Sequence, residues 1–220
     1  MRVSESVSPG ETPGVYIGRL RLEATRGRTA PWFIKKKFSR MIPERYSMAN
    51  ELYSVLGDRY ILYGELLYAK HTIFYNNLPH YFLEYDVLDL ATATFLDTNS
   101  RHNLLQNIDI ESVTVLYSGK PNKYSELTSL VKKSNYIKIG HIEVLKSLCT
   151  SRKIDQQRTI EETDNTNLME GLYIKLEKND IVKQRYKYIR EEFITKILNS
   201  SGHWLDRPII ANQLSASILL

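Results

Sequence analysis

Apolar and polar residues alternate along several short stretches of the chain, and this pattern predicts β-strands that are joined in pairs. Near the N-terminus, residues 15–17 and 20–24 flank the dipeptide Gly18-Arg19, which suits a type II′ turn, and the residues before them are expected to form a loop. A second hairpin is expected at residues 170–177 and 181–190, around turn residues 178–180. Stretches rich in aromatic and β-branched residues predict three more strands, at 59–75, 80–90 and 113–119.

Helical spacing of apolar residues appears between these strands. Residues 47–56 place Leu52, Val55 and Leu56 on one stripe, with Ser47 as the expected N-cap and Gly57 as the residue that ends the helix. Other helices are expected at 125–133, 140–149 and 191–202, a loop or exposed helix at 151–167, and an irregular tail at 203–214. Helices between antiparallel hairpins predict an α+β fold, and the length fits a single domain over residues 1–220.

Polar side chains interrupt the apolar strands at four places. Glu65 lies inside an apolar run, and Glu170 opens another. Strand alternation is expected to place Phe82, Glu84 and Asp86 on one face, and Lys183, Arg185 and Lys187 on one face with tyrosines on the other. An aromatic ring for a base, carboxylates for a ribose or metal, and cations for phosphates together suit a nucleoside triphosphate. Taken singly, each has an equally common alternative: Phe82 as plain core, Glu170 capped by a turn, Lys187 as a surface charge.

The bulk composition narrows the classes of protein that remain. The 220 residues carry a formal net charge of +5 with a pI of about 9.1, and basic runs at 35–40 and 183–190 suit an anionic partner. The single cysteine, Cys149, excludes a disulfide framework and fits a reducing cytoplasm. We expect no membrane contact, because no apolar run has the length of a membrane span, and we see no secretory signal. No glycine-rich phosphate loop or zinc-ligand spacing is present.

Four stretches, in order and spacing, closely resemble the ATP-dependent RNA ligase family, which belongs to the covalent nucleotidyltransferases. They are YILYGELLYAKHTIFYNNLPHYFLEYDVLD, LMEGLYIKLE, QRYKYIR and SGHWLDRPII, and the likeness covers nearly the whole chain from about Gly18 onward. The resemblance implies an adenylyltransferase (ATP-grasp-like) fold, in which two mainly antiparallel sheets enclose an ATP pocket. It also implies a role in RNA repair with ATP and Mg²⁺, in which a lysyl-AMP forms, AMP passes to an RNA 5′-phosphate, and the 3′-hydroxyl of another RNA end displaces AMP.

The resemblance also assigns roles to particular residues. Arg26 would touch phosphate, Glu65 would contact the ribose, and Phe82 would stack on adenine. Glu170 would help to hold metal or the adenylate. Arg185 and Lys187 would contact the α-phosphate, and Arg185 departs from the lysine that is usual in the family. Arginine keeps the positive charge and changes the hydrogen-bond geometry.

The family's nucleophile, the lysine of a Lys-x-Asp-Gly motif, is missing from the expected place within residues 1–30. Ser6 or Val7 stands where the lysine belongs, Ser8 or Pro9 replaces the aspartate, and no lysine precedes Lys35. Three explanations stay open: a degenerate ligase, a start that lies upstream or a frame error, and takeover by Lys35 or Lys70, of which Lys70 fits better. The leading interpretation is an RNA ligase acting on RNA ends; the alternatives are an inactive relative that binds nucleotide or RNA, and an interaction domain.

Overall fold

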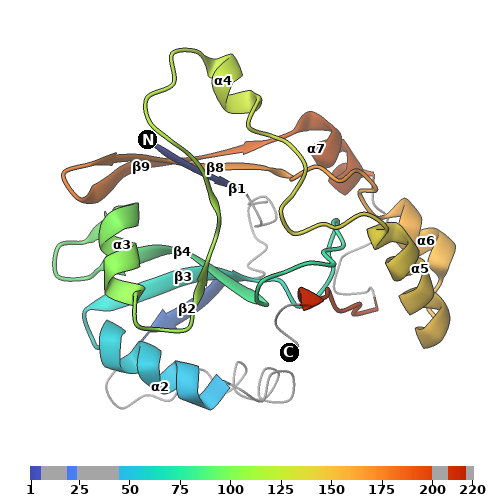
Figure 1. The fold of residues 1–220 in the computed structure, drawn as a ribbon, viewed down its shortest axis with the longest axis horizontal. Helices are drawn as coiled ribbons and strands as arrows, with labels where there is room; N and C mark the ends of the chain where they lie inside the picture. The colour runs from blue at the N-terminus through green and yellow to red at the C-terminus, as the bar shows by residue number, and fades with distance from the viewer. Residues whose placement is uncertain (6–18, 24–44, 200–207, 217–220) are drawn as a thin grey trace.

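The computed structural model describes residues 1–5, 19–23, 45–199 and 208–216, and it shows an α+β fold built on one curled sheet (Figure 1). The strands of this sheet are β1 (Arg2–Glu5), β2 (Arg19–Glu23), β3 (Tyr60–Leu66), β4 (Phe82–Asp89), β5 (Thr94–Leu96), β6 (Glu111–Ser112), β7 (Val115–Ser118), β8 (Gly171–Lys178) and β9 (Ile181–Ile189). Their order is β2-β3-β4-β5-β9-β8-β1-β7, with β6 paired to β4. The pairs are antiparallel except β4 with β6, so the predicted α+β class with mainly antiparallel pairing is confirmed.

The sheet folds over on itself, so that two arms face each other (Figure 1). One arm holds β2, β3 and β4, and the other holds β9, β8, β1 and β7; we call them the β3–β4 arm and the β8–β9 arm. The short strand β5 joins them, because Phe95 pairs with Leu88 of β4 on one side and with Val182 of β9 on the other. The expected arrangement of two separate sheets is therefore not confirmed, since the described strands form one continuous sheet.

The predicted hairpin at residues 170–190 is confirmed. β8 and β9 pair along their length, with Tyr173 opposite Lys187 and Lys175 opposite Arg185. The two residues that connect them, Asn179 and Asp180, have φ angles of 55° and 60°. Positive φ at both central residues is the signature of a type I′ turn, and asparagine and aspartate tolerate it better than most residues.

The N-terminal segment differs from its prediction. Residues 2–5 were expected to be a loop, but they form β1, which lies between β8 and β7 and pairs with both. Val3 is fully buried there. Four residues with one buried apolar side chain are too few to show an alternating pattern, so the strand is specified by its two neighbours rather than locally. The predicted strand 20–24 is confirmed as β2, which pairs with β3, whereas its proposed partner at 15–17 lies outside the described residues.

Most helices lie near their predicted places: α2 (Arg45–Leu56), α4 (Tyr124–Thr128), α5 (His141–Arg152), α6 (Gln156–Glu161) and α7 (Glu191–Leu198). Gly57 ends α2 with a φ of 48°, as expected, but the helix begins at Arg45, so Ser47 is not its N-cap. The helix α3 (Thr98–Leu105) was not predicted from the sequence. Its N-cap is Asp97, whose side chain accepts a hydrogen bond from the backbone N–H of Ser100 at 2.8 Å. Such a cap satisfies one of the open N–H groups at a helix start.

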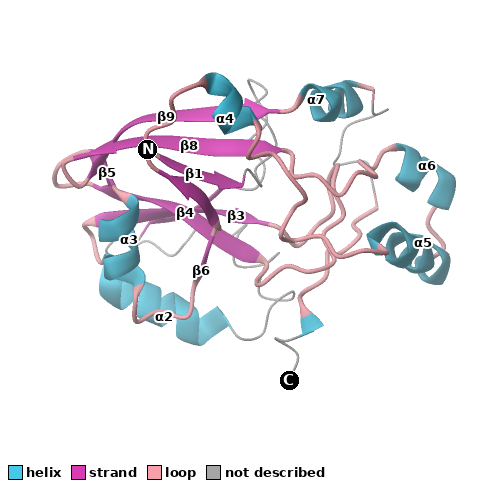
Figure 2. Cartoon of the chain, turned by 45° about the horizontal axis from the view of Figure 1, so that its top comes forward, coloured by secondary structure: helices cyan, strands magenta, loops and turns pink. Residues whose placement is uncertain are grey.

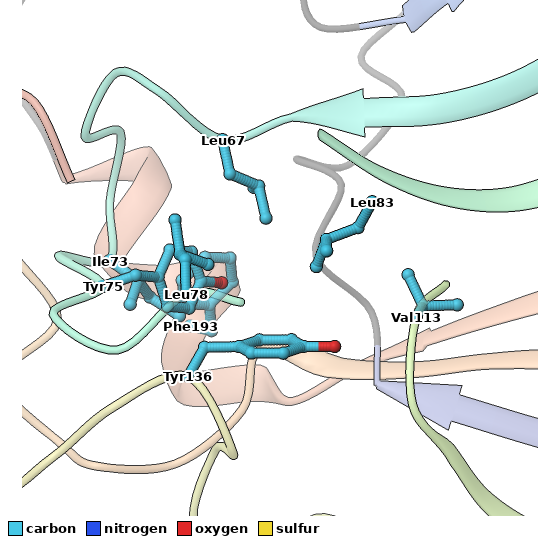
Figure 3. Packing of buried hydrophobic residues seen from close by; sticks show 8 residues of the cluster. All are labelled: Leu67, Ile73, Tyr75, Leu78, Leu83, Val113, Tyr136 and Phe193. Carbon is cyan, nitrogen blue, oxygen red and sulfur yellow. The ribbon is translucent and has the colours of Figure 1, made fainter. Parts of the chain in front are cut away.

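The stretch expected to be a strand through residue 75 leaves the sheet at Leu66. The apolar residues that follow turn inward and pack with Tyr136 and with Phe193 of α7 (Figure 3). The C-terminal tail holds this loop in place, because the Asn212 amide donates to Leu67 O at 2.8 Å and its oxygen accepts from Tyr75 N at 2.9 Å. The apolar run that suggested a long strand is thus the lining of a core.

Each arm is covered on its outer face (Figure 2). Leu52 and Leu56 of α2 pack with Leu62, Phe82 and Val87 beneath the β3–β4 arm. Val3, Leu172 and Ile174 pack beneath Leu127 and other residues of the α4 region on the β8–β9 arm. The inner faces of the two arms are therefore left for polar side chains.

Candidate nucleotide site

A β-bulge in β4 decides which of its side chains face the other arm. Tyr63 of β3 pairs with Asp86, whereas the next residue, Gly64, pairs with Glu84. Tyr85 is the extra residue between them. A bulge of this kind bends a strand and re-aims the side chains that follow it.

The bulge overturns the expectation that Phe82, Glu84 and Asp86 share one face. Phe82 and Val87 pack in the same outer cluster, although plain alternation would put them on opposite faces. Asp86 therefore lies on the inner side, where it contacts β8 and β9. Glu84 meets a third set of partners, since its carboxylate pairs with Arg101 of α3 at 2.5 Å and accepts a hydrogen bond from Ser112 of β6.

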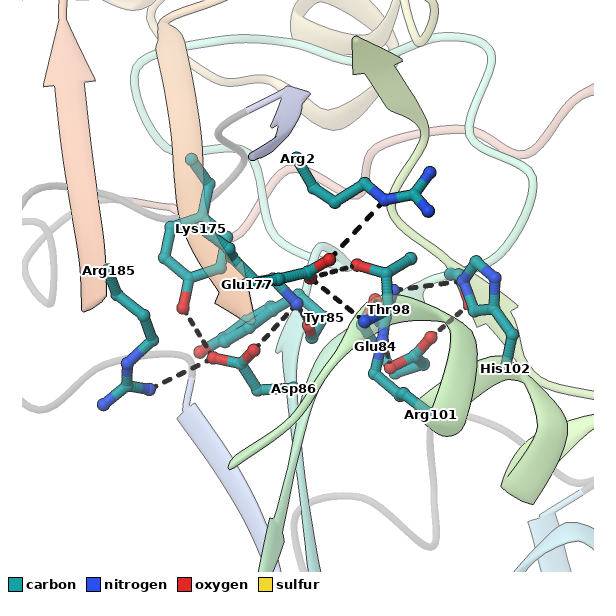
Figure 4. A network of polar contacts seen from close by, with 12 residues as sticks. Arg2, Glu84, Tyr85, Asp86, Thr98, Arg101, His102, Lys175, Glu177 and Arg185 are labelled. Carbon is teal, nitrogen blue, oxygen red and sulfur yellow. Dashed lines mark hydrogen bonds and ion pairs between the residues drawn. The ribbon is translucent and has the colours of Figure 1, made fainter. Parts of the chain in front are cut away.

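Asp86 is the centre of a buried polar cluster that ties the two arms together (Figure 4). Its carboxylate contacts Lys175 Nζ at 2.9 Å, the Tyr173 hydroxyl at 2.5 Å and the Arg185 guanidinium at 3.1 Å. Lys175 also donates to the carbonyl oxygen of Tyr85 at 2.6 Å. We call Asp86, Tyr173, Lys175 and Arg185 the Asp86 cluster.

Burial shapes the protonation of this cluster. Removal from water lowers the pKa of Lys175 from its ordinary value, and the charge of Asp86 opposes that shift. Burial, followed by the negative charge of Asp86, raises the pKa of Tyr173, so its hydroxyl remains a hydrogen-bond donor. Arg185 is held further by the ring of Phe95, whose centroid lies 3.8 Å from its guanidinium carbon. The positive charges of Lys175 and Arg185 thus offset the negative charge of Asp86.

A second set of polar residues lines a small pocket at the other end of the inner face. Glu65, at the end of β3, and Glu170, just before β8, both line it, and both side chains are buried. Lys187 of β9 forms an ion pair with Glu170 at 3.3 Å. We call this the carboxylate pocket; its other lining residues are Leu66, Leu67, Ala69, His71, Thr72, Ile73, Tyr75, Phe193 and Asn212.

Comparison with known families matches this chain to a model described as RNA ligase, over residues 22–189. The chain belongs to the RNA ligase family. The matched range covers most of the chain and includes both carboxylates of the pocket and Lys187. A search of curated proteins finds no match. None of the helices in the described ranges has the length and apolar character needed to cross a membrane.

The structure brings together three of the residues that the likeness to RNA ligases singled out. Glu65 and Glu170 line one pocket although more than a hundred positions separate them in sequence, and Lys187 joins them through Glu170. Arg185 lies further along β9 and is engaged by Asp86. Arg26 lies outside the described residues.

Phe82 is the predicted site residue that lies apart from the pocket. Its ring packs in the outer cluster with α2 and against the backbone of Gly64, where an added Cβ would come within 2.2 Å of the ring. A role for Phe82 in stacking on adenine stays a prediction that this packing does not support.

Sequence reasoning missed the aromatic residue that does face inward. Tyr85 packs against the cluster that includes the pocket residues Leu67 and Phe193, and its ring lies 5.5 Å from that of Tyr173. The missed signal is the bulge, which cannot be read from the alternation of YFLEYDV. Asn212 and His71 were also missed, because neither stands in a pattern that sets it apart.

The pocket offers carboxylates that could supply part of the coordination shell of a metal ion. Within residues 1–5, 19–23, 45–199 and 208–216, no three His, Cys, Asp or Glu side chains are grouped so as to hold a metal ion. Mg²⁺ is commonly bound by one or two carboxylates together with substrate phosphates and water. Glu170, which lines the pocket beside Glu65, could supply one such carboxylate.

Proposed function

We propose that this RNA ligase family member binds ATP with Mg²⁺ at the carboxylate pocket and joins RNA ends through enzyme-AMP and RNA-adenylate intermediates. The observation that carries the proposal is the convergence of Glu65, Glu170 and Lys187 at one pocket. Glu65 would contact the ribose, and Glu170 would help to hold Mg²⁺ or the adenylate. The partners are an RNA 5′-phosphate and an RNA 3′-hydroxyl, and the reducing cytoplasm suits the single buried Cys149.

The pairing of Glu170 with Lys187 suits a site that exchanges partners. Each group offsets the other's charge. An α-phosphate would take over Lys187, and Mg²⁺ would take over Glu170, so that both charges stay balanced. Lysine commonly binds phosphate, and a carboxylate commonly binds Mg²⁺.

The pocket is small, so we propose that the nucleotide extends from it along the inner face of the arms. Tyr85 faces this space and, in place of Phe82, is proposed to stack on adenine. Arg185 lies on the same face of β9 as Lys187, two positions along the strand. It would have to exchange Asp86 for phosphate in order to act on the nucleotide.

The proposed reaction has three transfers of the same kind. An amine nitrogen bonds to the α-phosphorus of ATP and loses a proton as the bond to the β-phosphate oxygen breaks and pyrophosphate leaves. An oxygen of the RNA 5′-phosphate then attacks the same phosphorus, the P–N bond breaks, and the amine leaves as it regains a proton. Finally, the 3′-hydroxyl oxygen attacks the RNA 5′-phosphorus and loses its proton as the bond to the AMP phosphate oxygen breaks and AMP leaves. Preorganised cations stabilise the charge that develops in each step.

The attacking amine is the unassigned part of the site. Residues 1–34 contain no lysine, and β1 ends at Glu5, opposite Leu172 and therefore close in register to Glu170. Lys70 lies in the loop between the pocket residues Ala69 and His71, and its Nζ donates to the His71 carbonyl at 2.8 Å. It is the candidate replacement in the described part of the chain.

The missing lysine favours a second candidate function, a family member that binds ATP or RNA without forming a lysyl-AMP. An intact-mass measurement after incubation with ATP and Mg²⁺ separates the two. An added AMP that is lost in Lys70→Arg supports the ligase reaction with Lys70 as nucleophile. An unmodified chain that ATP still protects against thermal unfolding supports the second candidate. Protection should reach about 2.7 kcal/mol at 100-fold excess over Kd, and its absence would contradict both.

A further inference from the structure

The outer face of β9 carries two tyrosines that the pocket does not use, Tyr186, which is exposed, and Tyr188, which is half-buried. Tyr186 and Tyr188 pair with Ile174 and Leu172, which belong to the outer cluster of the β8–β9 arm. Tyr186 is 53% exposed, and Tyr124 of α4 is 68% exposed. The Tyr124 and Tyr188 rings meet edge to face with centroids 6.3 Å apart. We call Tyr124, Tyr186 and Tyr188 the tyrosine face.

The segments that supply this face are rich in lysine. Residues 113–133 contain Lys120, Lys123, Lys132 and Lys133 against a single acidic residue, Glu126, and residues 181–190 contain no acidic residue. Lys123 directly precedes Tyr124 and is exposed. Lys183 is also exposed, and it is the extra residue of a bulge in β9, because Gln184 pairs with Leu176 and Val182 pairs with Glu177, so it lies at the edge between the two faces. The surface therefore combines exposed rings with positive charge.

The edge of β9 connects this face with the inner face. In the described part of the sheet, β5 pairs only with Val182 and Ile181, so β9 has no strand neighbour on that side from Lys183 onward. Along this open edge the side chains alternate, with Tyr186 and Tyr188 outward and Arg185 and Lys187 inward. A chain with bases and phosphates could follow the edge from one face to the other.

We propose that the tyrosine face binds single-stranded RNA next to the end that reacts, with Tyr186 and Tyr124 stacking on bases and Lys123 and Lys183 pairing with phosphates. Stacking on aromatic side chains together with cations along the backbone is the general mode of single-strand binding. The proposal takes RNA as the partner from family membership and does not depend on whether the pocket binds ATP. Unstacked bases are needed, so a duplex is a poor occupant of this face.

Fluorescence anisotropy with a labelled 12-nucleotide RNA of mixed sequence tests the proposal on the full chain. We expect Tyr186→Ala to weaken binding about tenfold, within the range for loss of one stacked base, and Tyr124→Ala to weaken it similarly. Tyr53→Ala is the matched control, because Tyr53 is 54% exposed and lies on α2, on the opposite side of the molecule (Figure 1). It should leave the affinity unchanged.

The salt dependence tests the lysines separately. Each phosphate contact adds about 0.7 to the slope of log K against log salt for a single strand, so Lys123→Gln and Lys183→Gln should each reduce the slope by about that amount. Lys146→Gln, at an exposed position of α5, should leave the slope unchanged. Wild-type affinity in the double variant Tyr186→Ala, Tyr124→Ala would overturn the proposal. So would a loss of affinity in Tyr53→Ala as large as that in Tyr186→Ala. A Tyr186→Ala variant that loses as much affinity for duplex RNA as for single-stranded RNA would also overturn it. Thermal protection by ATP, measured on the same variants, should stay unchanged and so keeps this test apart from that of the pocket.

Discussion

The Asp86 cluster and the carboxylate pocket lie on the same inner surface and contain the same kinds of groups, yet they are arranged for different ends. In the cluster, one carboxylate meets an amine, a guanidinium and a hydroxyl, all within 3.1 Å. In the pocket, two glutamates border a cavity, and the ion pair between Glu170 and Lys187 is longer, at 3.3 Å. A buried carboxylate whose charge is paired inside the protein, such as that of Asp86, therefore stabilises the fold, whereas charges that border a cavity are available to a ligand.

The largest change in the free energy of unfolding should come from removing the carboxylate of Asp86 from the Asp86 cluster. Asp86→Ala leaves Lys175 buried without its carboxylate, and loss of one partner of a buried pair costs about 3–5 kcal/mol. Urea denaturation should show this loss in the free energy of unfolding. The double variant Asp86→Leu, Lys175→Met removes both charges and should recover much of it. If the free energy of unfolding of Asp86→Ala falls by less than about 1 kcal/mol, the Asp86 cluster does not stabilise the fold as proposed.

The next effect contrasts two aromatic residues on β4. Phe82→Ala should lower the free energy of unfolding by about 3 kcal/mol, because it empties a packed outer cluster, and should leave the affinity for ATP unchanged. Tyr85→Ala should instead weaken ATP binding about tenfold, the loss of one ring stacked on a base. Isothermal titration and urea denaturation give both quantities. If Phe82→Ala weakens ATP binding and Tyr85→Ala does not, Phe82 is the residue that stacks on adenine.

A third contrast uses two glutamates at the two ends of β8. Glu170→Gln should weaken ATP-Mg²⁺ binding about tenfold, which equals about 1.4 kcal/mol, with little change in stability. Glu177 accepts hydrogen bonds from Thr98 at 2.6 Å and 3.0 Å, so Glu177→Gln should cost about 1 kcal/mol of stability and leave ATP binding intact. If both variants lose ATP affinity equally, the two ends of the inner face do not have separate roles.

The sequence predicted the parts of the fold that local chemistry specifies. The turn at Asn179-Asp180 and the alternation of β8 and β9 are such parts, because each depends on neighbouring residues. The pairing of Asp86 with Lys175 depends on strands far apart in the sequence, and β1 is held by two strands rather than by its own pattern. A single bulged residue, Tyr85, was enough to exchange the expected facing of Phe82 and its neighbours.

The site was predicted to a similar extent and for a similar reason. Glu65, Glu170 and Lys187 could be named because each stands out in its own stretch and resembles a family motif. Asn212, which the tail brings to the pocket, has no such signal, because its role comes from hydrogen bonds to Leu67 and Tyr75. Only the three-dimensional path of the loop after β3 shows why that asparagine is buried.

The smallest change in the free energy of unfolding is expected at the rim of the sheet, where a charge pair lies partly in water. Arg59 donates to both oxygens of Asp89, at 3.1 Å and 2.8 Å, and these hydrogen bonds lower the pKa of Asp89 below its ordinary value of 3.8. A carboxylate with a lowered pKa in the folded state adds stability above its unfolded pKa, and that stability is lost as the pH falls through the folded pKa. Asp89→Asn should therefore reduce stability at pH 7 by the least of the four changes, because solvent screens an exposed arginine.

The pH dependence distinguishes this rim pair from the buried cluster. In urea denaturation from pH 7 downward, the difference between wild type and Asp89→Asn should narrow once the pH falls below about 3.8, because the protonated carboxyl then resembles the amide. Added salt at pH 7 should shrink the same difference, since exposed charges are screened, and it should hardly change the cost of Asp86→Ala. A difference that persists undiminished in acid and in salt would show that Asp89 stabilises the sheet through its shape and its bond to the Ala91 backbone, rather than through the charge of Arg59.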